Sequence, residues 1–210
     1  MPPRPSPKEP SLAFRHLANT HLAAPVPVTT MAMHETAVLE TAFFDRPADI
    51  VARDLPGRTL VRRIGRQRVA LIISETEAYL GPHDLACHAA RGRTPRTEVM
   101  FAAAGTLYVY LVYGMYWMLN VVTGPAGYPA AVLIRAAGGV SGPGRLARAL
   151  AIDGSLNGRR AGQQAGLWFE AGAGPARVLA TPRVGIDYAG PRWSGRKLRF
   201  VIARSTARKE

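Results

Sequence analysis

The residues with the clearest capacity for chemistry lie in the segment ETEAYLGPHDLACH, from Glu75 to His88. Its lead-in VALIIS is apolar, and the alternation that begins at Glu75 is typical of a strand leaving a core for an open cleft. Alternate residues of a strand share one face, so the carboxylates of Glu75 and Glu77 should point the same way. His83, Asp84 and His88 follow closely. Such a set could form either a general base or a metal site.

The spacing of the histidines favours the base. His83 and His88 are five residues apart, whereas a helical pair of metal ligands needs a separation of four. There is no HExxH pattern, and the single cysteine, Cys87, excludes a multi-cysteine zinc site. Cys87 also lacks a recognisable nucleophile signature. We therefore expect a metal-free carboxylate base and leave a catalytic metal as the alternative.

A group of tyrosines follows in the segment from Leu107 to Thr123. The run LYVYLVY alternates, Gly114 permits a turn, and a strand pattern resumes at Met118, which predicts a hairpin with aromatic residues at its tip. In a buried hairpin every tyrosine hydroxyl would need a hydrogen-bond partner. The tyrosines of this segment are Tyr108, Tyr110, Tyr113 and Tyr116, and we expect some of them to line a wet cleft.

The elements that position these groups are short. Turn signals after Tyr79 predict a long structured loop before the tyrosine hairpin, in the segment LGPHDLACHAARGRTPR. Long structured loops are usually functional. The strand pattern AAVLIR ends at Arg135, which would need an anionic neighbour inside a core, so a surface strand end is its simpler interpretation. The other expected elements are a helical turn at Ile50–Leu55, a helix in SGPGRLARALAID, and strands at Thr59–Val61, Val69–Ile73, Arg177–Ile186 and Lys197–Ile202.

Length and composition indicate one domain. The chain has 210 residues, and its first 41 are rich in proline without sustained periodicity, which predicts a disordered N-terminal arm. We expect a folded domain over residues 42–204 and a flexible tail over 205–210. Within the domain, the Gly/Ala/Gln-rich stretch 157–174 is expected to be mobile.

The charge balance favours a polyanionic partner. The formal net charge is +13, and all but three of the 27 basic residues are arginine, whose planar fork matches phosphate oxygens. Nucleic acid is therefore favoured over an anionic membrane, although GC-rich codon usage would give the same composition. The apolar run Leu107–Val122 spans about sixteen residues, short of the roughly twenty that a membrane span needs. One cysteine suits a reducing cytoplasmic or nucleoid location.

A carboxylate base, tyrosine faces and arginine-rich loops are together what an enzyme needs to act on a base inside duplex DNA. Such an enzyme must wedge a side chain into the base stack and hold the extruded base between aromatic faces, while arginines hold the phosphates. At this point four long motifs become informative. The chain resembles the alkyladenine (3-methyladenine) DNA glycosylase family, from about Phe43 to Val201, in ETEAYLGPHDLACHAARGRTPR, MFAAAGTLYVYLVYGMYWMLNVV, AAVLIRA and SGPGRLARALAID.

The resemblance implies a role for each matched position. Glu77 would be the general base that activates water, and Arg135 would help to position that water and the lesion phosphate. Tyr113 would fill the space that the flipped base leaves in the duplex. The base-binding positions would be the stacking residues Tyr79 and Tyr110, the pocket histidine His88 and the pocket asparagine Asn120.

The resemblance also implies the fold and the reaction. The fold would be α+β, a single domain with a curved, mainly antiparallel sheet surrounded by helices. The reaction would be hydrolysis of the N-glycosidic bond of 3-methyladenine, 7-methylguanine, hypoxanthine or ethenoadenine, without a cofactor. The folded region has one lysine, Lys197, away from the motifs, so a monofunctional enzyme without a lyase step is expected.

The expected partner is double-stranded DNA that contains damaged purines, bound by a monomer in the bacterial cytoplasm at the nucleoid, with no membrane involved. Two other classes of function stay open. A metal-dependent nuclease could use Glu75, Glu77, His83 and His88, and a non-catalytic DNA-binding module could rely on the arginines alone.

Overall fold

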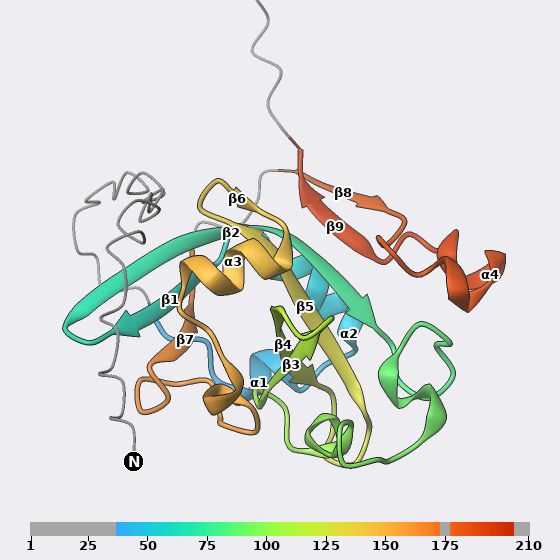
Figure 1. Ribbon diagram of the computed structural model, residues 1–210. Helices are drawn as coiled ribbons and strands as arrows, with labels where there is room; N and C mark the ends of the chain where they lie inside the picture. Colours follow the sequence, from blue (N-terminus) through green and yellow to red (C-terminus); the bar gives the residue numbers. More distant parts are fainter. Residues whose placement is uncertain (1–36, 173–176, 204–210) are drawn as a thin grey trace, which may run out of the picture. The chain divides into compact units, whose positions relative to one another are not determined.

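The computed structural model describes residues 37–172 and 177–203, and it shows an α+β body in which short helices flank one sheet (Figure 1). Within the described residues the strands are β1 (Thr59–Ile64), β2 (Gln67–Tyr79), β3 (Leu107–Val112), β4 (Tyr116–Thr123), β5 (Ala130–Ala137), β6 (Val140–Ser141), β7 (Leu167–Glu170), β8 (Val178–Thr181) and β9 (Arg199–Ile202). The α-helices are α1 (Thr41–Phe44), α2 (Ala48–Asp54), α3 (Pro143–Ala149) and α4 (Pro191–Ser194). Short 3-10 helices are η1 (His88–Arg91), η2 (Glu98–Phe101), η3 (Gly154–Leu156) and η4 (Asp187–Ala189).

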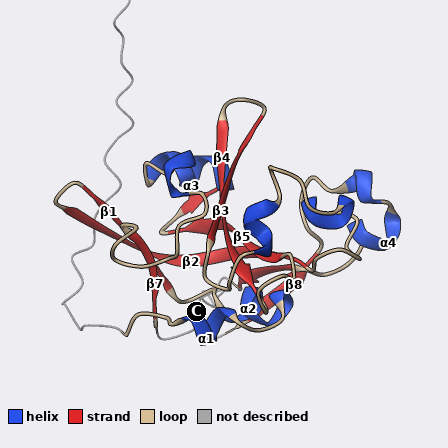
Figure 2. Ribbon diagram, turned by 90° about the horizontal axis from the view of Figure 1, so that it is seen from below, coloured by secondary structure: helices blue, strands red, loops and turns tan. Residues whose placement is uncertain are grey.

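The long strand β2 organises the sheet. Its first half pairs with β1, and its second half lies between β5 and β9, so the main order is β3-β4-β5-β2-β1-β7. Every pairing among the described strands is antiparallel, and β2 bends as a long arc in Figure 1. The β3–β4 hairpin projects from the sheet (Figure 2). The predicted fold class is confirmed.

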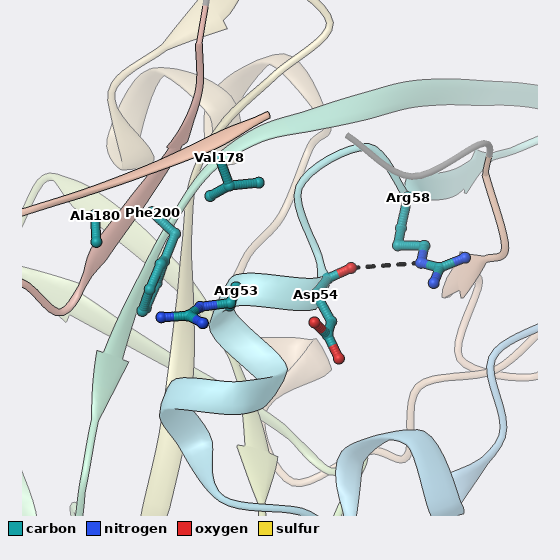
Figure 3. Close-up of a pocket in the computed structure, with 6 residues that line it drawn as sticks. All are labelled: Arg53, Asp54, Arg58, Val178, Ala180 and Phe200. Atoms are coloured by element: carbon teal, nitrogen blue, oxygen red, sulfur yellow. Dashed lines mark hydrogen bonds between the residues drawn. The ribbon is translucent and has the colours of Figure 1, made fainter. Parts of the chain in front are cut away.

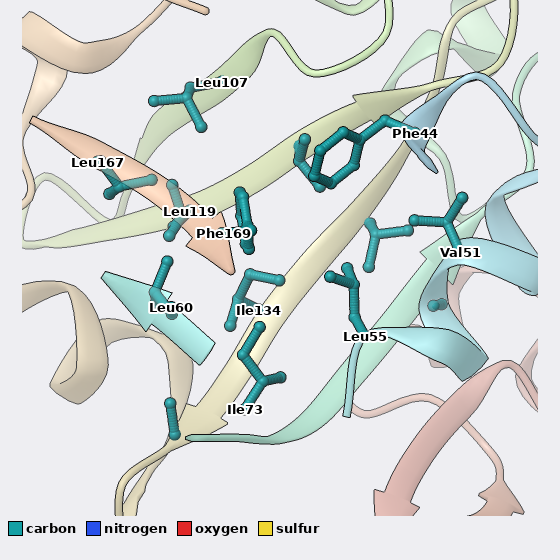
Figure 4. Close-up of a cluster of buried hydrophobic side chains, with 14 of the residues drawn as sticks. Phe44, Val51, Leu55, Leu60, Ile73, Leu107, Leu119, Ile134, Leu167 and Phe169 are labelled. Carbon is teal, nitrogen blue, oxygen red and sulfur yellow. The ribbon is translucent and has the colours of Figure 1, made fainter. Parts of the chain in front are cut away.

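The core lies where α1 and α2 pack on the sheet (Figure 4). Val51 of α2 and Leu55, directly after the helix, meet Ile73 of β2 and Ile134 of β5, and all four side chains are fully buried. Burying an aliphatic side chain contributes roughly 1.5–3 kcal/mol, so these side chains stabilise the packing of α2 on the sheet. The register of β2 shifts between Ile73 and Thr76. Beyond the shifts Thr76 faces α2, where its hydroxyl donates to Ala52 O, so Glu75 and Glu77, which alternate with Thr76, lie on the opposite face of the sheet.

Most of the predicted elements are present. The helical turn at Ile50–Leu55 corresponds to α2, and the predicted strand pair from Thr59 to Ile73 forms β1 and β2, both of which are longer than predicted. The aromatic hairpin appears as β3 and β4. The last predicted strand pair is shorter than expected, because β8 ends at Thr181, just before Pro182, which has no N–H to donate.

The prediction of a mobile stretch over 157–174 was wrong for its second half. Residues Leu167–Glu170 form the buried strand β7, which pairs with β1. Three consecutive apolar side chains fill the core there, and the indole of Trp168 donates to Glu170 Oε1 at 2.7 Å. The flanking glycines and glutamines masked this four-residue strand in the composition.

The predicted N-terminal arm lies mainly outside the described residues, as does the predicted tail at 205–210. The described part of the arm runs beside β7. Leu39 N–H donates to Phe169 O at 2.8 Å, and Ala171 N–H donates to Ala37 O at 2.8 Å. No described helix is long and apolar enough to span a membrane.

A buried ion pair joins two distant loops beside the sheet. Arg183, which follows β8, donates two hydrogen bonds to the Asp84 carboxylate at 2.6 and 2.9 Å, and both side chains are fully buried. Asp84 also accepts from the backbone N–H groups of Leu80 and Ala86. The pair therefore locks the loop after β2 against the segment before η4.

We expect Asp84→Asn to lower the free energy of unfolding by about 3–5 kcal/mol, because the substitution leaves the Arg183 guanidinium buried without its counterion. Glu98→Gln is the control, since it breaks the exposed Arg93–Glu98 pair and should change stability by at most about 1 kcal/mol. Urea denaturation of both variants measures the difference. Equal stabilities would mean that Arg183 leaves its buried position at no cost.

Candidate active site

Two carboxylates and two arginines meet where β2, β5 and β9 lie side by side. Arg135 of β5 donates from Nε to Glu75 Oε1 at 2.8 Å, and its Nη1 lies 3.4 Å from Glu77 Oε1. Arg199 of β9 donates to the same oxygen of Glu75 at 3.0 Å. Glu75 and Glu77 therefore share one face, as predicted, and Arg135 is a bridge between them.

Two expectations about this cluster were wrong. The alternation at Glu75 does not mark a strand leaving the core, because β2 becomes more buried toward its end and Glu77 is 0 % exposed. Arg135 is not at an exposed strand end, because the carboxylates of Glu75 and Glu77 supply the anionic neighbours that a buried arginine needs.

Both carboxylate oxygens of Glu77 accept hydrogen bonds. Its Oε1 accepts the backbone N–H of Val184 at 2.8 Å, and its Oε2 accepts the Tyr79 hydroxyl at 3.0 Å. Burial raises the pKa of Glu77, although Arg135, the Val184 N–H and the Tyr79 hydroxyl act in the opposite direction. A carboxylate with a raised pKa is a stronger base than a solvated one.

A cavity of about 470 Å³ lies in front of this cluster. Three of the groups that contact Glu77, namely Tyr79, Arg135 and Val184, line it, so Glu77 itself lies one layer behind the wall. The remaining wall combines aromatic and aliphatic side chains. All five base-binding and arginine positions implied by the resemblance contribute to the lining: Tyr79, His88, Tyr110, Asn120 and Arg135.

His88 forms one corner of the cavity together with two tyrosines. Its Nδ1 lies 3.0 Å from the Tyr108 hydroxyl, and the Tyr110 ring packs edge-on at 4.6 Å between centroids. Burial lowers the pKa of His88 to about 4, and the Arg96 guanidinium adds to that shift. The imidazole is therefore neutral at physiological pH.

Asn120 is buried in the floor of the cavity. Its amide nitrogen donates to the carbonyl oxygens of Tyr108 at 3.0 Å and Met118 at 3.4 Å, which fixes the side chain across the β3–β4 hairpin. Asn120 thus has a structural role in the hairpin and also presents its side chain to the cavity.

Tyr113 lies at the tip of the projecting hairpin and is 85 % exposed. Its φ is 52°, in the left-handed region that costs a bulky residue roughly 1–2 kcal/mol. Gly114 follows with φ of 67°, and the turn is closed by a hydrogen bond from Met115 N–H to Val112 O. A large aromatic residue held in this conformation without burying its ring gains nothing for the fold, so its value must lie elsewhere.

A second cavity, of about 510 Å³, lies on the other face of β2 and β9 (Figure 3). Phe200, directly opposite Thr76 in the sheet, lines it, so it opens away from Glu77. Arg53 lies against the Phe200 ring, while Arg58 donates to backbone oxygens of Asp54 and Gly172. This cavity brings together none of the predicted site residues.

The side chains proposed for a metal site are engaged separately. Glu75 and Glu77 contact arginines, His88 contacts Tyr108, and His83 Nδ1 lies 3.3 Å from the Tyr128 hydroxyl. In residues 37–172 and 177–203, no three His, Cys, Asp or Glu side chains come together as a metal-binding group.

Sequence reasoning missed three contributors to the site. Val184 contributes a backbone N–H, which no residue type in the sequence signals. The Arg183 guanidinium lies 4.8 Å from the Tyr79 ring centroid and donates to the carbonyl of Ala78. Arg183 and Ala78 are 105 residues apart, so no local pattern links them. Arg96 belongs to the long loop LGPHDLACHAARGRTPR, whose turn signals do not indicate which of its arginines lines the cavity.

Comparisons with known proteins bear on the whole body. The family model described as Methylpurine-DNA glycosylase (MPG) matches residues 42–206. A protein of Methanocella arvoryzae named "Putative 3-methyladenine DNA glycosylase" is 47 % identical over 173 residues, which cover 73 % of this chain and 86 % of that protein. Proteins with the same name from Myxococcus xanthus (47 %, covering 78 % and 89 %) and Legionella pneumophila (42 %, covering 78 % and 93 %) are also similar.

We expect His88 to stay neutral until the pH falls close to 4, which NMR of the imidazole resonances, assigned by loss in His88→Gln, would measure. The unfolded chain should take up this proton near pH 6.5, before the folded chain does. The His88 contribution to stability should therefore be complete above about pH 6.5 and be lost as the pH falls toward 4. A midpoint near 6.5 in the folded protein would contradict the burial of this ring.

Proposed function

The chain belongs to the methylpurine-DNA glycosylase family, and on that premise we propose that its aromatic cavity receives damaged purines flipped out of duplex DNA. The protein is a DNA glycosylase, an N-glycosyl hydrolase of base excision repair. The proposed substrates are 3-methyladenine, which the names of the relatives mention, and 7-methylguanine, hypoxanthine and ethenoadenine. The proposed products are a free base and an abasic site.

The observation that carries the proposal is the position of Glu77. A fully buried carboxylate lies directly behind a cavity whose lining includes five tyrosines and a neutral histidine. A planar base fits between such faces, and base–aromatic stacking is worth roughly 1–3 kcal/mol per base. The proposed stacking residues are Tyr79 and Tyr110, with His88 at the edge and Asn120 at the floor.

In the proposed mechanism Glu77 removes a proton from water as the oxygen attacks the sugar carbon and the glycosidic electron pair leaves with the base. Glu77 must first gain contact with that water. Of its bonds, the one from the Tyr79 hydroxyl to Oε2 is made by a side chain of the cavity wall. A base that stacks on Tyr79 can turn this ring and free Oε2 for water.

Arg135 and Glu75 support this step in different ways. Arg135 lines the cavity and touches both carboxylates, so it can position the water and the lesion phosphate while stabilising ionised Glu77. Glu75 does not line the cavity, and it fixes Arg135 and Arg199. We assign Glu75 a positioning role and Glu77 the catalytic one.

The charge of the leaving base sets the demand on the protein. Cationic bases such as 3-methyladenine are already good leaving groups, whereas neutral hypoxanthine needs a proton on the departing purine. For a cationic lesion the rate should therefore rise with pH through the raised pKa of Glu77, because only the ionised carboxylate acts as a base.

Tyr113 is proposed to fill the gap in the duplex. Its ring lies at the tip of the hairpin whose inner residues, Tyr108 and Tyr110, form the cavity wall, so one element carries both the wedge and the pocket. The net charge of +13 would hold the phosphates nearby. We further propose a monomer on double-stranded DNA, in a bacterial cytoplasm at the nucleoid.

We expect Glu77→Gln to keep DNA binding but slow base release at least about a hundredfold, since general base catalysis typically contributes 10²–10⁴. Single-turnover release of 3-methyladenine and hypoxanthine from duplex DNA measures the loss. Glu75→Gln is the matched control, and it should lose stability more than activity because Glu75 anchors two arginines. An equal activity loss in Glu75→Gln would mean that the assignment is reversed.

Borohydride trapping during the same reaction tests whether the enzyme is monofunctional. Among the described residues Lys197 is the single lysine, and it is exposed and does not line the cavity. Borohydride should therefore trap no covalent adduct with the DNA, because water is the nucleophile. An adduct that Lys197→Ala abolishes would show a lyase step, and absence of any base release would refute the proposed function.

We expect Tyr113→Ala to leave the melting temperature unchanged, since the ring is exposed, yet to slow excision from paired sites more than from mispaired or single-stranded ones. The reason is that filling the vacated space matters only where a partner base remains to compete. Parallel excision assays on these substrates, with a thermal melt, decide this. Equal losses on all substrates would place Tyr113 in the binding of the base itself.

A further inference from the structure

Arg96 places a positive charge in the cavity wall. It belongs to the loop between η1 and η2, its side chain is solvent-exposed, and it is one of the residues that line the cavity. Its guanidinium carbon lies 5.2 Å from the centroid of the Tyr110 ring, which is the distance of a cation–π contact. Arg96 thus shares the ring on which a flipped base is proposed to stack.

The electrostatic effect of Arg96 reaches the neighbouring cavity side chains. Burial dominates at each one, lowering the pKa of His88 and raising the pKa values of Tyr108 and Tyr110. At all three groups the positive charge of Arg96 acts to lower the pKa. The positive charge of Arg96 therefore acts on the side chains that a bound base would contact.

No lining side chain neutralises this charge. None of the described residues that line the cavity is Asp or Glu, and its charged members are Arg96 and Arg135. Arg135 already faces the carboxylates of Glu75 and Glu77 behind the wall. Glu98, on the neighbouring turn, pairs with Arg93 at 3.0 Å. The mouth of the cavity is consequently positive on the Tyr110 side.

A base with a fixed positive charge and a neutral base would experience this wall differently. A cationic base would compete with Arg96 for the π electrons of Tyr110 and would be repelled by it, whereas a neutral purine would meet neither penalty. The aromatic faces alone would favour the cation, so Arg96 acts against the preference of the rings.

We propose that Arg96 is a specificity-determining residue that shifts the cavity away from cationic lesions and toward neutral ones. The inference rests on the proposed function, because it assumes that the base stacks on Tyr110. A simpler role for an exposed arginine is a phosphate contact, which would help every lesion equally. The two roles predict different ratios of excision.

The test compares 7-methylguanine, which is cationic in DNA, with neutral hypoxanthine in the same duplex sequence, using kcat/KM for each. Arg96→Gln should raise the ratio of cationic to neutral excision by about two- to fivefold, the size of one exposed cation–π contact. Arg96→Lys keeps the charge and should hold the ratio closer to that of the unmodified protein. Arg93→Gln is the control for net charge, because Arg93 pairs with Glu98 and does not line the cavity.

A ratio that is unchanged in Arg96→Gln, or changed equally in Arg93→Gln, overturns the inference. Equal losses on both lesions with a salt slope reduced by about one would identify a phosphate contact instead. An independent readout is the NMR titration midpoint of His88, which should rise in Arg96→Gln and stay fixed in Arg93→Gln. If the unmodified protein released neither base, the proposed function would fail, while an unmoved His88 midpoint would separately refute the reach of Arg96.

Discussion

The structure depends most on the pairing of buried carboxylates with arginines at the centre of the sheet. A carboxylate buried without a partner would be several kcal/mol unfavourable, so the positions of Glu77 and Glu75 inside the fold depend on their contacts with Arg135 and Arg199. Those contacts tie β2 to β5 on one side and to β9 on the other. The charges to which we assign the proposed chemistry are therefore also the ones that fix the neighbours of β2.

The cavity in front of these charges follows a different rule. Its lining includes several tyrosines and a histidine whose pKa is held low, so the proposed stacking faces for a base are uncharged at neutral pH. The charged side chains are Arg135 and Arg96 in the cavity lining and Glu77 one layer behind it. This separation lets a flat aromatic ligand enter without displacing a hydration shell from each ionised group, while the buried carboxylate keeps its raised basicity.

Local patterns predicted most of the elements, and the resemblance singled out several residues that line the cavity, but neither identified the partners that are distant in sequence. The alternation in LYVYLVY and the turn at Gly114 were sufficient for the hairpin, because both signals are local. The Asp84–Arg183 pair and the Val184 N–H on Glu77 join segments about a hundred residues apart, and neither spacing nor residue type specifies such partners. The burial of β7 was missed because four apolar-rich residues are diluted by glycine on both sides.

The closed arrangement around Glu77 gives the proposed reaction its order. Without a ligand, Oε1 is occupied by the Val184 N–H and Arg135, and Oε2 by the Tyr79 hydroxyl, so water has little room at the carboxylate. Tyr79 is at once the cap on Glu77 and a proposed stacking face for the base. Movement of this one ring on base binding would therefore couple recognition to activation of water. The contacts from Val184 and Arg135 would meanwhile keep Oε1 in place, so that Oε2 becomes accessible to water while the carboxylate stays oriented.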